Sequence, residues 1–243
     1  MPQNYYKMDK IQKKLPKKVD EQLEYTGCKI NKHMLICGAT GTGKTITLFD
    51  YIIQTSKPRK GTFKKIFVCY KTDEILYDVL KDELKDGILF FKSVAEFPSV
   101  NDFPDAITND YKDNYLIVFD DCIGDKDKMS SKKIEDYMTY GRKKNLTIIF
   151  LTQSFFQTNI FLRKQVSYVL LLSIKGKRDL NAILSDYGSL QTNPEELYRI
   201  FKIATTPTEN DEMPFLKISA DAGPDNKKFS KSWTGFIEFE SKI

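Results

Sequence analysis

Eight consecutive residues have the types and the spacing of a phosphate-binding loop. They are Gly38, Ala39, Thr40, Gly41, Thr42, Gly43, Lys44 and Thr45, and they fit the pattern G-x-x-x-x-G-K-[S/T]. Glycines let such a loop turn tightly, so that several backbone N–H groups converge on the same phosphate oxygens. Lys44 would reach the β- and γ-phosphates of ATP, and the Thr45 hydroxyl would ligate Mg²⁺.

The segments that flank this loop are the ones that it requires. The apolar run HMLIC, residues 33–37, precedes it, and a helical pattern with Leu48 and Ile52 near one face follows it. A helix that begins at the loop directs the positive end of its dipole at the bound anion. A chance glycine-rich turn is the alternative, and the strand before the loop and the helix after it argue against that alternative.

A second candidate site lies where an apolar run ends in two acids. The run is YLIVFDD, and its acids are Asp120 and Asp121. Carboxylates at the end of a buried strand are costly unless a cation or hydrogen bonds satisfy them. We expect Asp120 to hold the Mg²⁺ shell and Asp121 to act as the general base for the attacking water. A turn or a helix cap is the alternative interpretation.

Gln153 follows the apolar run LTIIFL, residues 146–151. Ligands of a parallel sheet bind at the carboxyl ends of its strands, so a polar side chain in this place could sense the γ-phosphate or orient water. The alternative is an ordinary loop residue after a strand.

Arg142 lies between the two runs, in the segment GRKK. An arginine beside the transferring phosphate stabilises its charge, and in a ring it would come from the neighbouring subunit. The alternative is a basic residue that favours a helix C-terminus. Three other arginines are rival fingers: Arg163, Arg178 and Arg199.

The elements that must position these residues alternate along the chain. Nearly continuous apolar runs alternate with helical patterns, which is typical of βαβ units with a parallel sheet that helices cover on both faces. Strands are expected at residues 33–37, 65–70, 87–91, 115–119, 146–151, 167–174, 215–220 and 235–239. Helices are expected at residues 44–54, 73–84 and 131–140, and another begins at Asn193-Pro194. The second helix carries Ile75, Leu76, Val79 and Leu80 as its apolar residues.

The chain of 243 residues is long enough for one sizeable α/β core. We expect a basic N-terminal arm at residues 1–30, an ATPase core at 31–204, and a C-terminal extension at 205–243 that packs on the core. The arm holds six crowded lysines: Lys7, Lys10, Lys13, Lys14, Lys17 and Lys18. Such an arm binds nucleic acid or a partner, or is simply solvated.

The bulk properties indicate a soluble protein that works inside a cell. No apolar run approaches the roughly 20 residues that span a bilayer, and the first twenty residues lack the apolar stretch of a signal peptide. The 4 cysteines have no metal-ligand spacing and are expected to be free buried thiols. A net charge of +5 is compatible with a polyanionic partner without identifying one.

Together, GATGTGKT, LIVFDD, and a helix with GR before LTQS resemble the FtsK–HerA superfamily, and within it the DNA packaging ATPases of poxviruses, giant viruses and virophages. The resemblance covers residues 31–175. It implies a three-layer P-loop fold, RecA-like and of the additional-strand branch, with a mostly parallel central sheet flanked by helices. Relatives often have Arg-His before the Gln strand, whereas this chain has Arg142-Lys143, so the finger assignment stays open.

The resemblance implies a Mg²⁺-dependent ATPase that forms a pentameric or hexameric homo-oligomeric ring and pulls double-stranded DNA into a preformed capsid. Portal or vertex proteins of the capsid are candidate partners, and the host cytoplasm is the expected place of action. DNA contacts should be basic or aromatic loop residues, for which the candidates are Lys126, Lys128, Lys132 and Lys133. The alternatives are a small-molecule phosphotransferase, a nucleotide-gated scaffold, and a related DNA-pumping or secretion ATPase.

Overall fold

The computed structural model describes residues 23–57, 62–106, 113–122, 127–156, 158–174, 176–187, 193–220 and 227–237. The six lysines of the basic arm and Lys126 lie outside this part of the chain. No helix among the described residues is long and apolar enough to cross a membrane.

A central sheet contains all the strands that the described residues form, in the order β3-β2-β4-β5-β1-β6-β7-β8-β9. Neighbours from β3 to β6 are parallel, and β7, β8 and β9 continue the sheet in antiparallel pairs. The strands are His33–Cys37 (β1), Lys65–Tyr70 (β2), Ile88–Phe91 (β3), Tyr115–Asp120 (β4), Leu146–Thr152 (β5), Tyr168–Leu171 (β6), Leu216–Ser219 (β7), Phe229–Lys231 (β8) and Gly235–Phe236 (β9).

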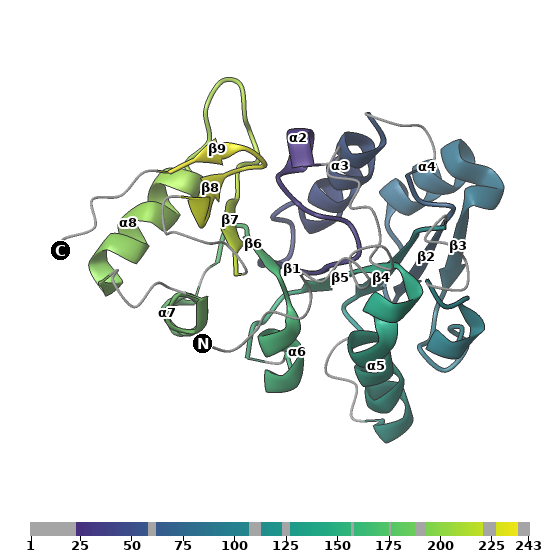
Figure 1. The fold of residues 1–243 in the computed structure, drawn as a ribbon. Coiled ribbons are helices and arrows are strands. Elements are labelled where there is room, and N and C mark those ends of the chain that lie inside the picture. Colours follow the sequence, from purple (N-terminus) through teal and green to yellow (C-terminus); the bar gives the residue numbers. More distant parts are fainter. Residues whose placement is uncertain are drawn as a thin grey trace, which may run out of the picture.

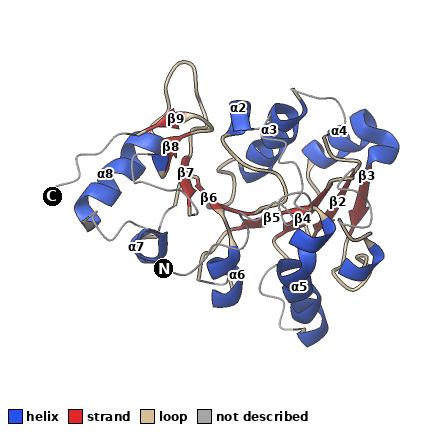
Figure 2. Ribbon diagram, in the orientation of Figure 1, coloured by secondary structure: helices blue, strands red, loops and turns tan. Residues whose placement is uncertain are grey.

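Helices cover both faces of this sheet, which makes three layers (Figures 1 and 2). The α-helices are Leu23–Thr26 (α2), Lys44–Ser56 (α3), Ile75–Leu84 (α4), Lys128–Tyr140 (α5), Ile160–Gln165 (α6), Lys177–Tyr187 (α7) and Pro194–Thr205 (α8). Short 3₁₀ turns are Lys85–Gly87 (η2), Val100–Asp102 (η3) and Gly141–Lys144 (η4). Helices α3 and α4 pack on one face, and α5 to α8 pack on the other.

Strand β4 shows why the sheet is buried on both sides. Ile117 and Phe119 face the core beneath α5 to α8, whereas Leu116 and Val118 face the core beneath α3 and α4. Alternate residues of a strand point to opposite faces, so a strand with helices on both sides must be apolar at every position. This is the physical reason for the continuous apolar runs, and the α/β fold expected from them is confirmed.

The position of β5 brings the candidate site together. This strand lies between β1 and β4, and its register pairs Thr152 with Cys37 and Leu151 with Asp120. The three strands are parallel, so their carboxyl ends share one edge of the sheet. The phosphate-binding loop, the two acids and Gln153 therefore lie at three adjacent strand ends.

Several elements differ from the expectations. The strand expected at 167–174 is only Tyr168–Leu171, and helices α6 and α7 and strand β8 were not expected. The apolar face expected for α4 is wrong at two positions, because Ile75 is 82% exposed and Val79 is 41% exposed. The side chains of this helix that point into the core are Tyr77 and Leu80, each 3% exposed.

A buried lysine joins the two ends of the described chain to the sheet. Lys217 of β7 is 1% exposed, and its ammonium donates hydrogen bonds to the backbone oxygens of Thr26 and Trp233. Thr26 and Cys28 are fully buried. Residues 23–30, which we assigned to the arm, therefore pack against the core, while the boundaries at 30/31 and 204/205 stay predictions.

Candidate nucleotide-binding site

The phosphate-binding loop connects the carboxyl end of β1 to the first turn of α3. Its backbone takes positive φ angles at Gly41, 75°, and at Gly43, 92°. Residues that have a Cβ rarely adopt φ angles this positive, so glycine is favoured at both turns. Gly38 is required for a different reason, because a Cβ there would lie 2.5 Å from Thr42 Oγ1 and 2.9 Å from Leu172 Cβ.

The side chains of the loop are held by its own backbone. Lys44 Nζ donates to the carbonyl oxygens of Gly38, at 3.2 Å, and Ala39, at 3.3 Å. Thr42 Oγ1 donates to the same Ala39 oxygen at 2.7 Å. The ammonium of Lys44 therefore lies folded over the loop, while Thr45 is buried in the first turn of α3. A cation and the N-terminus of a 13-residue helix meet in one place, as phosphate binding needs.

Asp120 is the last residue of β4 and is 7% exposed. Its Oδ2 accepts a hydrogen bond of 2.6 Å from the hydroxyl of Tyr77, which lies on α4. Burial raises the pKa of the Asp120 carboxyl to about 6, and the nearby charge of Asp121 also raises it, whereas the Tyr77 hydroxyl and Lys44 act in the opposite direction.

Asp121, Gln153 and Thr40 form a chain of hydrogen bonds across three strand ends. Gln153 Nε2 donates to Asp121 Oδ2 at 2.6 Å, and Thr40 Oγ1 donates to Gln153 Oε1 at 2.8 Å. The backbone of Asp121 has a φ of 51°, and its N–H donates to Leu151 O at 3.1 Å, which turns the chain away from the strand. The amide of Gln153 thus joins the candidate base to the phosphate-binding loop.

The oxygen ligands that the protein offers at this edge of the sheet fit Mg²⁺. Thr45 offers a hydroxyl, and Asp120 offers a carboxylate of which only Oδ2 is taken by Tyr77. Among the described residues no group of three or more His, Cys, Asp or Glu side chains could form an all-protein metal cage. Mg²⁺ needs no such cage, because it is usually bound through one or two carboxylates together with substrate phosphates and waters.

A family model decides the relationship of this chain to known proteins. The model described as Poxvirus A32 protein matches residues 26–216, which is more than half of the 243 residues. The chain belongs to the poxvirus A32 protein family. No curated protein matches it.

Solved structures share the fold of this A32-family chain. The crystal structure of B204, the DNA-packaging ATPase from Sulfolobus turreted icosahedral virus, matches with a TM-score of 0.56 and 13% identity over 84% of this chain and 97% of that chain. B204 from Sulfolobus turreted icosahedral virus 2 in complex with AMPPCP matches with a TM-score of 0.55 and 14% identity over 83% and 97%. The cytoplasmic domain of the type VII secretion ATPase EccC from Thermomonospora curvata matches with 0.55 and 13% over 85% and 25%.

Arg142 lies at the opposite edge of the sheet in the A32-family chain. It is exposed in η4, which precedes the amino end of β5, whereas Gln153 follows the carboxyl end. Strand β5 has seven residues, so at about 3.3 Å per residue its ends are roughly 20 Å apart. A finger role within its own subunit would need Arg142 on the other edge, so its role in catalysis stays a prediction.

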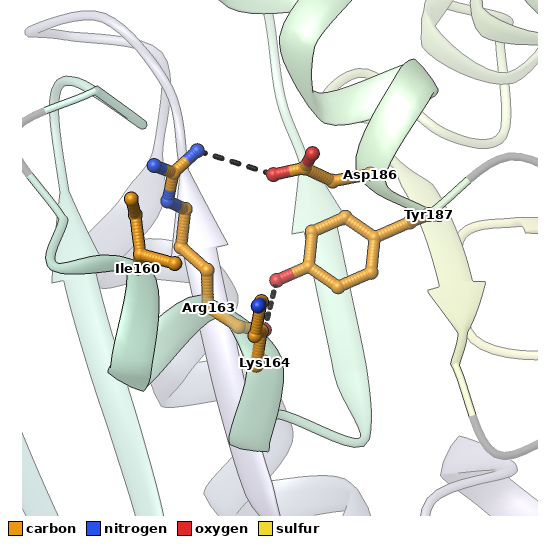
Figure 3. Close-up of a pocket in the computed structure, with 5 residues that line it drawn as sticks. All are labelled: Ile160, Arg163, Lys164, Asp186 and Tyr187. Atoms are coloured by element: carbon orange, nitrogen blue, oxygen red, sulfur yellow. Dashed lines mark hydrogen bonds and ion pairs between the residues drawn. The ribbon is translucent and has the colours of Figure 1, made fainter.

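The rival arginines have partners of their own. Arg163 pairs with Asp186 at 3.1 Å and lies over the Phe155 ring, and Figure 3 shows its guanidinium directed at Asp186 beside a small pocket. Arg199 pairs with Glu196 on the exposed side of α8. Arg178 lies over the ring of Phe156, which follows Gln153 on the nucleotide edge.

Two residues near the site escaped the sequence interpretation. Tyr77 could have been found from the spacing of Tyr77, Leu80 and Leu84, which mark the buried face of α4 better than Ile75 and Val79 do. Met213 had no such signal. Its methyl group lies 2.4 Å from the position that a Cβ on Gly43 would take, although Met213 is distant from Gly43 in the sequence.

The described lysines that we expected to contact DNA differ in their surroundings. Lys133 Nζ donates to the carbonyl oxygens of Val94, Ala95 and Phe97, so it tethers a loop rather than facing solvent. Lys132 pairs with Asp136 at 3.3 Å along α5, and Lys128 is exposed in the first turn of that helix.

Proposed function

We propose that this chain is an ATP-hydrolysing motor that translocates double-stranded DNA and packages a viral genome into a preformed capsid. The observation that carries the proposal is the meeting of Lys44, Asp121 and Gln153 at one edge of the sheet. Membership in the A32 family and the shared fold with B204, which is a DNA-packaging ATPase, support it.

The chemistry assigns one task to each group. Lys44 and the N–H groups of the loop bind the β- and γ-phosphates, and Thr45 with Asp120 would hold Mg²⁺. When bound, Mg²⁺ neutralises charge that develops on the phosphate oxygens. Asp121 accepts a proton from the attacking water, and the hydrogen bond from Gln153 holds its carboxylate toward the loop.

The link from Thr40 through Gln153 to Asp121 supports a sensing role for Gln153. Thr40 belongs to the loop that surrounds the phosphates, so a nucleotide that moves Thr40 also moves the amide on the base. Gln153 is exposed, so its contacts cost little to rearrange. We expect ATP binding to shift this amide from Thr40 to the nucleotide.

The second candidate function is that of a secretion ATPase, since EccC from Thermomonospora curvata has the same fold with a TM-score of 0.55. Fold alone does not separate the two, because one fold hosts several functions. The A32 family match favours packaging.

We further propose a homo-oligomeric ring of five or six subunits in the host cytoplasm, with portal or vertex proteins of the capsid as partners.

The deciding assay is phosphate release from ATP with and without double-stranded DNA, over a range of salt concentrations. DNA should stimulate turnover, and the stimulation should weaken with salt, because phosphate contacts release counterions.

Lys44→Ala should abolish turnover and weaken nucleotide binding. Asp121→Asn should keep ATP binding and slow hydrolysis by roughly 10²–10⁴-fold, because its amide cannot take a proton.

Three results would refute this function. Turnover that DNA leaves unchanged argues against a DNA motor, and phosphate transfer to a small acceptor indicates a phosphotransferase. Normal turnover by Lys44→Ala removes the assignment of the loop itself.

A further inference from the structure

One hydrogen bond at the candidate site comes from a helix that carries none of the nucleotide motifs. The hydroxyl of Tyr77 donates to Asp120 Oδ2 at 2.6 Å, across 43 positions of sequence. Tyr77 is 3% exposed and belongs to α4, which follows β2, the strand beside β4. This contact therefore joins a neighbouring βα unit to the carboxylate at the end of β4.

The ring of Tyr77 is fixed by other aromatic side chains. It lies edge to face with Tyr70, with ring centroids 5.1 Å apart, and tilted against Phe90 at 5.6 Å. Tyr70 and Phe90 also contact each other at 5.7 Å. Aromatic pairs in such arrangements stabilise one another beyond the effect of their burial. The hydroxyl is thus presented to Asp120 from a rigid platform and not from a mobile side chain.

The hydrogen bond from Tyr77 occupies one of the two carboxylate oxygens of Asp120 and leaves the other for a different partner. A buried carboxylate needs partners, and Tyr77 supplies one for Oδ2. We propose that Tyr77 is a positioning residue for the metal: by holding Oδ2 it fixes the rotation of the Asp120 carboxylate and reserves Oδ1 for Mg²⁺. This inference rests on the proposed function, since it assumes that Asp120 holds the ion.

The phenol suits this task better than other donors would. A hydroxyl that donates to a metal-ligating carboxylate stays neutral, so it does not compete with the cation as a lysine or arginine would. The ordinary pKa of a tyrosine hydroxyl is about 10, so the proton stays on the phenol at neutral pH. Partners of metal ligands typically change metal affinity by about 10–100-fold when they are removed.

Tyr77→Phe is the variant that tests this, because phenylalanine keeps the ring contacts and removes only the donor. Tyr137→Phe is the matched control. Tyr137 is also buried among aromatic rings, and its hydroxyl donates to Pro98 O at 2.9 Å from α5, on the face of the sheet opposite to Tyr77. Each change thus removes one hydrogen bond of one buried tyrosine.

The readout is Mn²⁺ binding in the presence of ADP, followed by electron paramagnetic resonance, and ADP binding in EDTA on the same samples. Tyr77→Phe should bind Mn²⁺ about 10–100-fold more weakly while its metal-free ADP affinity stays the same. Tyr137→Phe should leave both constants unchanged. Because both constants come from molecules that bind ADP, loss of folded protein cannot imitate the result.

Asp120→Ala separates failure of this inference from failure of the site. If Asp120→Ala weakens Mn²⁺ binding and Tyr77→Phe does not, Tyr77 is only a packing residue and the inference is wrong. If Asp120→Ala itself binds Mn²⁺ as the wild type does, the proposed metal site falls, and the inference falls with it.

Discussion

At the scale of single residues, the buried carboxyl of Asp120 lowers the stability of the fold when it is ionised. Its carboxyl ends a strand that is buried along its whole length, and its pKa is raised from 3.8 to about 6, chiefly by burial. A raised pKa means that the native state binds the proton more tightly than the unfolded chain does. The favourable contribution is therefore present at low pH and is lost as the pH rises through about 6.

Asp120→Asn should stabilise the nucleotide-free protein at pH 7.5. Asparagine keeps the size of the side chain and can still accept the Tyr77 hydrogen bond, but it has no charge to bury. We expect a gain of about 1–3 kcal/mol in the free energy of unfolding. Urea denaturation in EDTA measures it.

The pH dependence is the internal control for Asp120→Asn. The gain should shrink when the same denaturation is repeated at pH 5, because the wild-type carboxyl is then largely protonated. A variant that is less stable than the wild type at pH 7.5, or equally more stable at both pH values, would show that the charge of Asp120 is not what the fold resists.

At the scale of elements, β7 pairs with β6 and β8 in the sheet and also anchors segments from both ends of the described chain. Lys217 is buried on this strand, where burial lowers its pKa, and its ammonium satisfies the backbone oxygens of Thr26 and Trp233. A buried carbonyl group that loses a hydrogen bond is costly in such a place. The lysine therefore holds residues 23–30 and the turn after β8 in one arrangement.

Lys217→Ala should lower the free energy of unfolding by about 2–4 kcal/mol, through a cavity and the lost hydrogen bonds. Hydrogen exchange should show lost protection at residues 23–30 before strand β4 is affected. Lys231→Ala is the matched control, since Lys231 also donates to one backbone oxygen, that of Thr206, but from a partly exposed position. An equal effect of the two substitutions would contradict an anchoring role for Lys217.

At the scale of the whole molecule, the nucleotide edge and Arg142 lie at opposite ends of β5. A subunit with this arrangement cannot complete its own site with Arg142. Two subunits can do so if the edge that carries η4 in one approaches the nucleotide edge of the next. Whether Arg142 acts as a finger therefore depends on how the subunits assemble.

A mixing experiment tests Arg142 in the assembled protein. Arg142→Ala has an intact phosphate-binding loop, and Lys44→Ala has an intact arginine, so each alone should be inactive. Their mixture should regain part of the ATPase activity, because some interfaces then pair an intact loop with an intact Arg142. A finger of this kind is worth about 10³–10⁵-fold in rate. Full activity of Arg142→Ala alone would leave it as a residue of the helix terminus and direct attention to Arg163 and Arg178.

The local features of this protein could be predicted from its sequence. The bounds of β1 and β2 match the expected residues, and α3 begins at Lys44 as expected, because strand burial, glycine turns and helix starts depend on neighbours in the chain. Helices α6 and α7 and strand β8 escaped prediction. Strand β8 has three residues, too few to show a period, and it forms only because β7 offers it an edge.

The tertiary structure decided every contact that joins distant residues. Which face of α4 is buried depends on the sheet beneath it, so Ile75 is exposed while Tyr77 reaches Asp120. The amide of Gln153 meets Thr40 across 113 positions, because β5 lies beside β1 in the sheet. Strand order is set by the packing of all the helices and strands together, and no local pattern contains it. The residue types of the site could therefore be recognised in the sequence, whereas their hydrogen bonds to one another follow from the order of the strands. Arg142 is separated from them because it precedes β5, whereas Gln153 follows that strand.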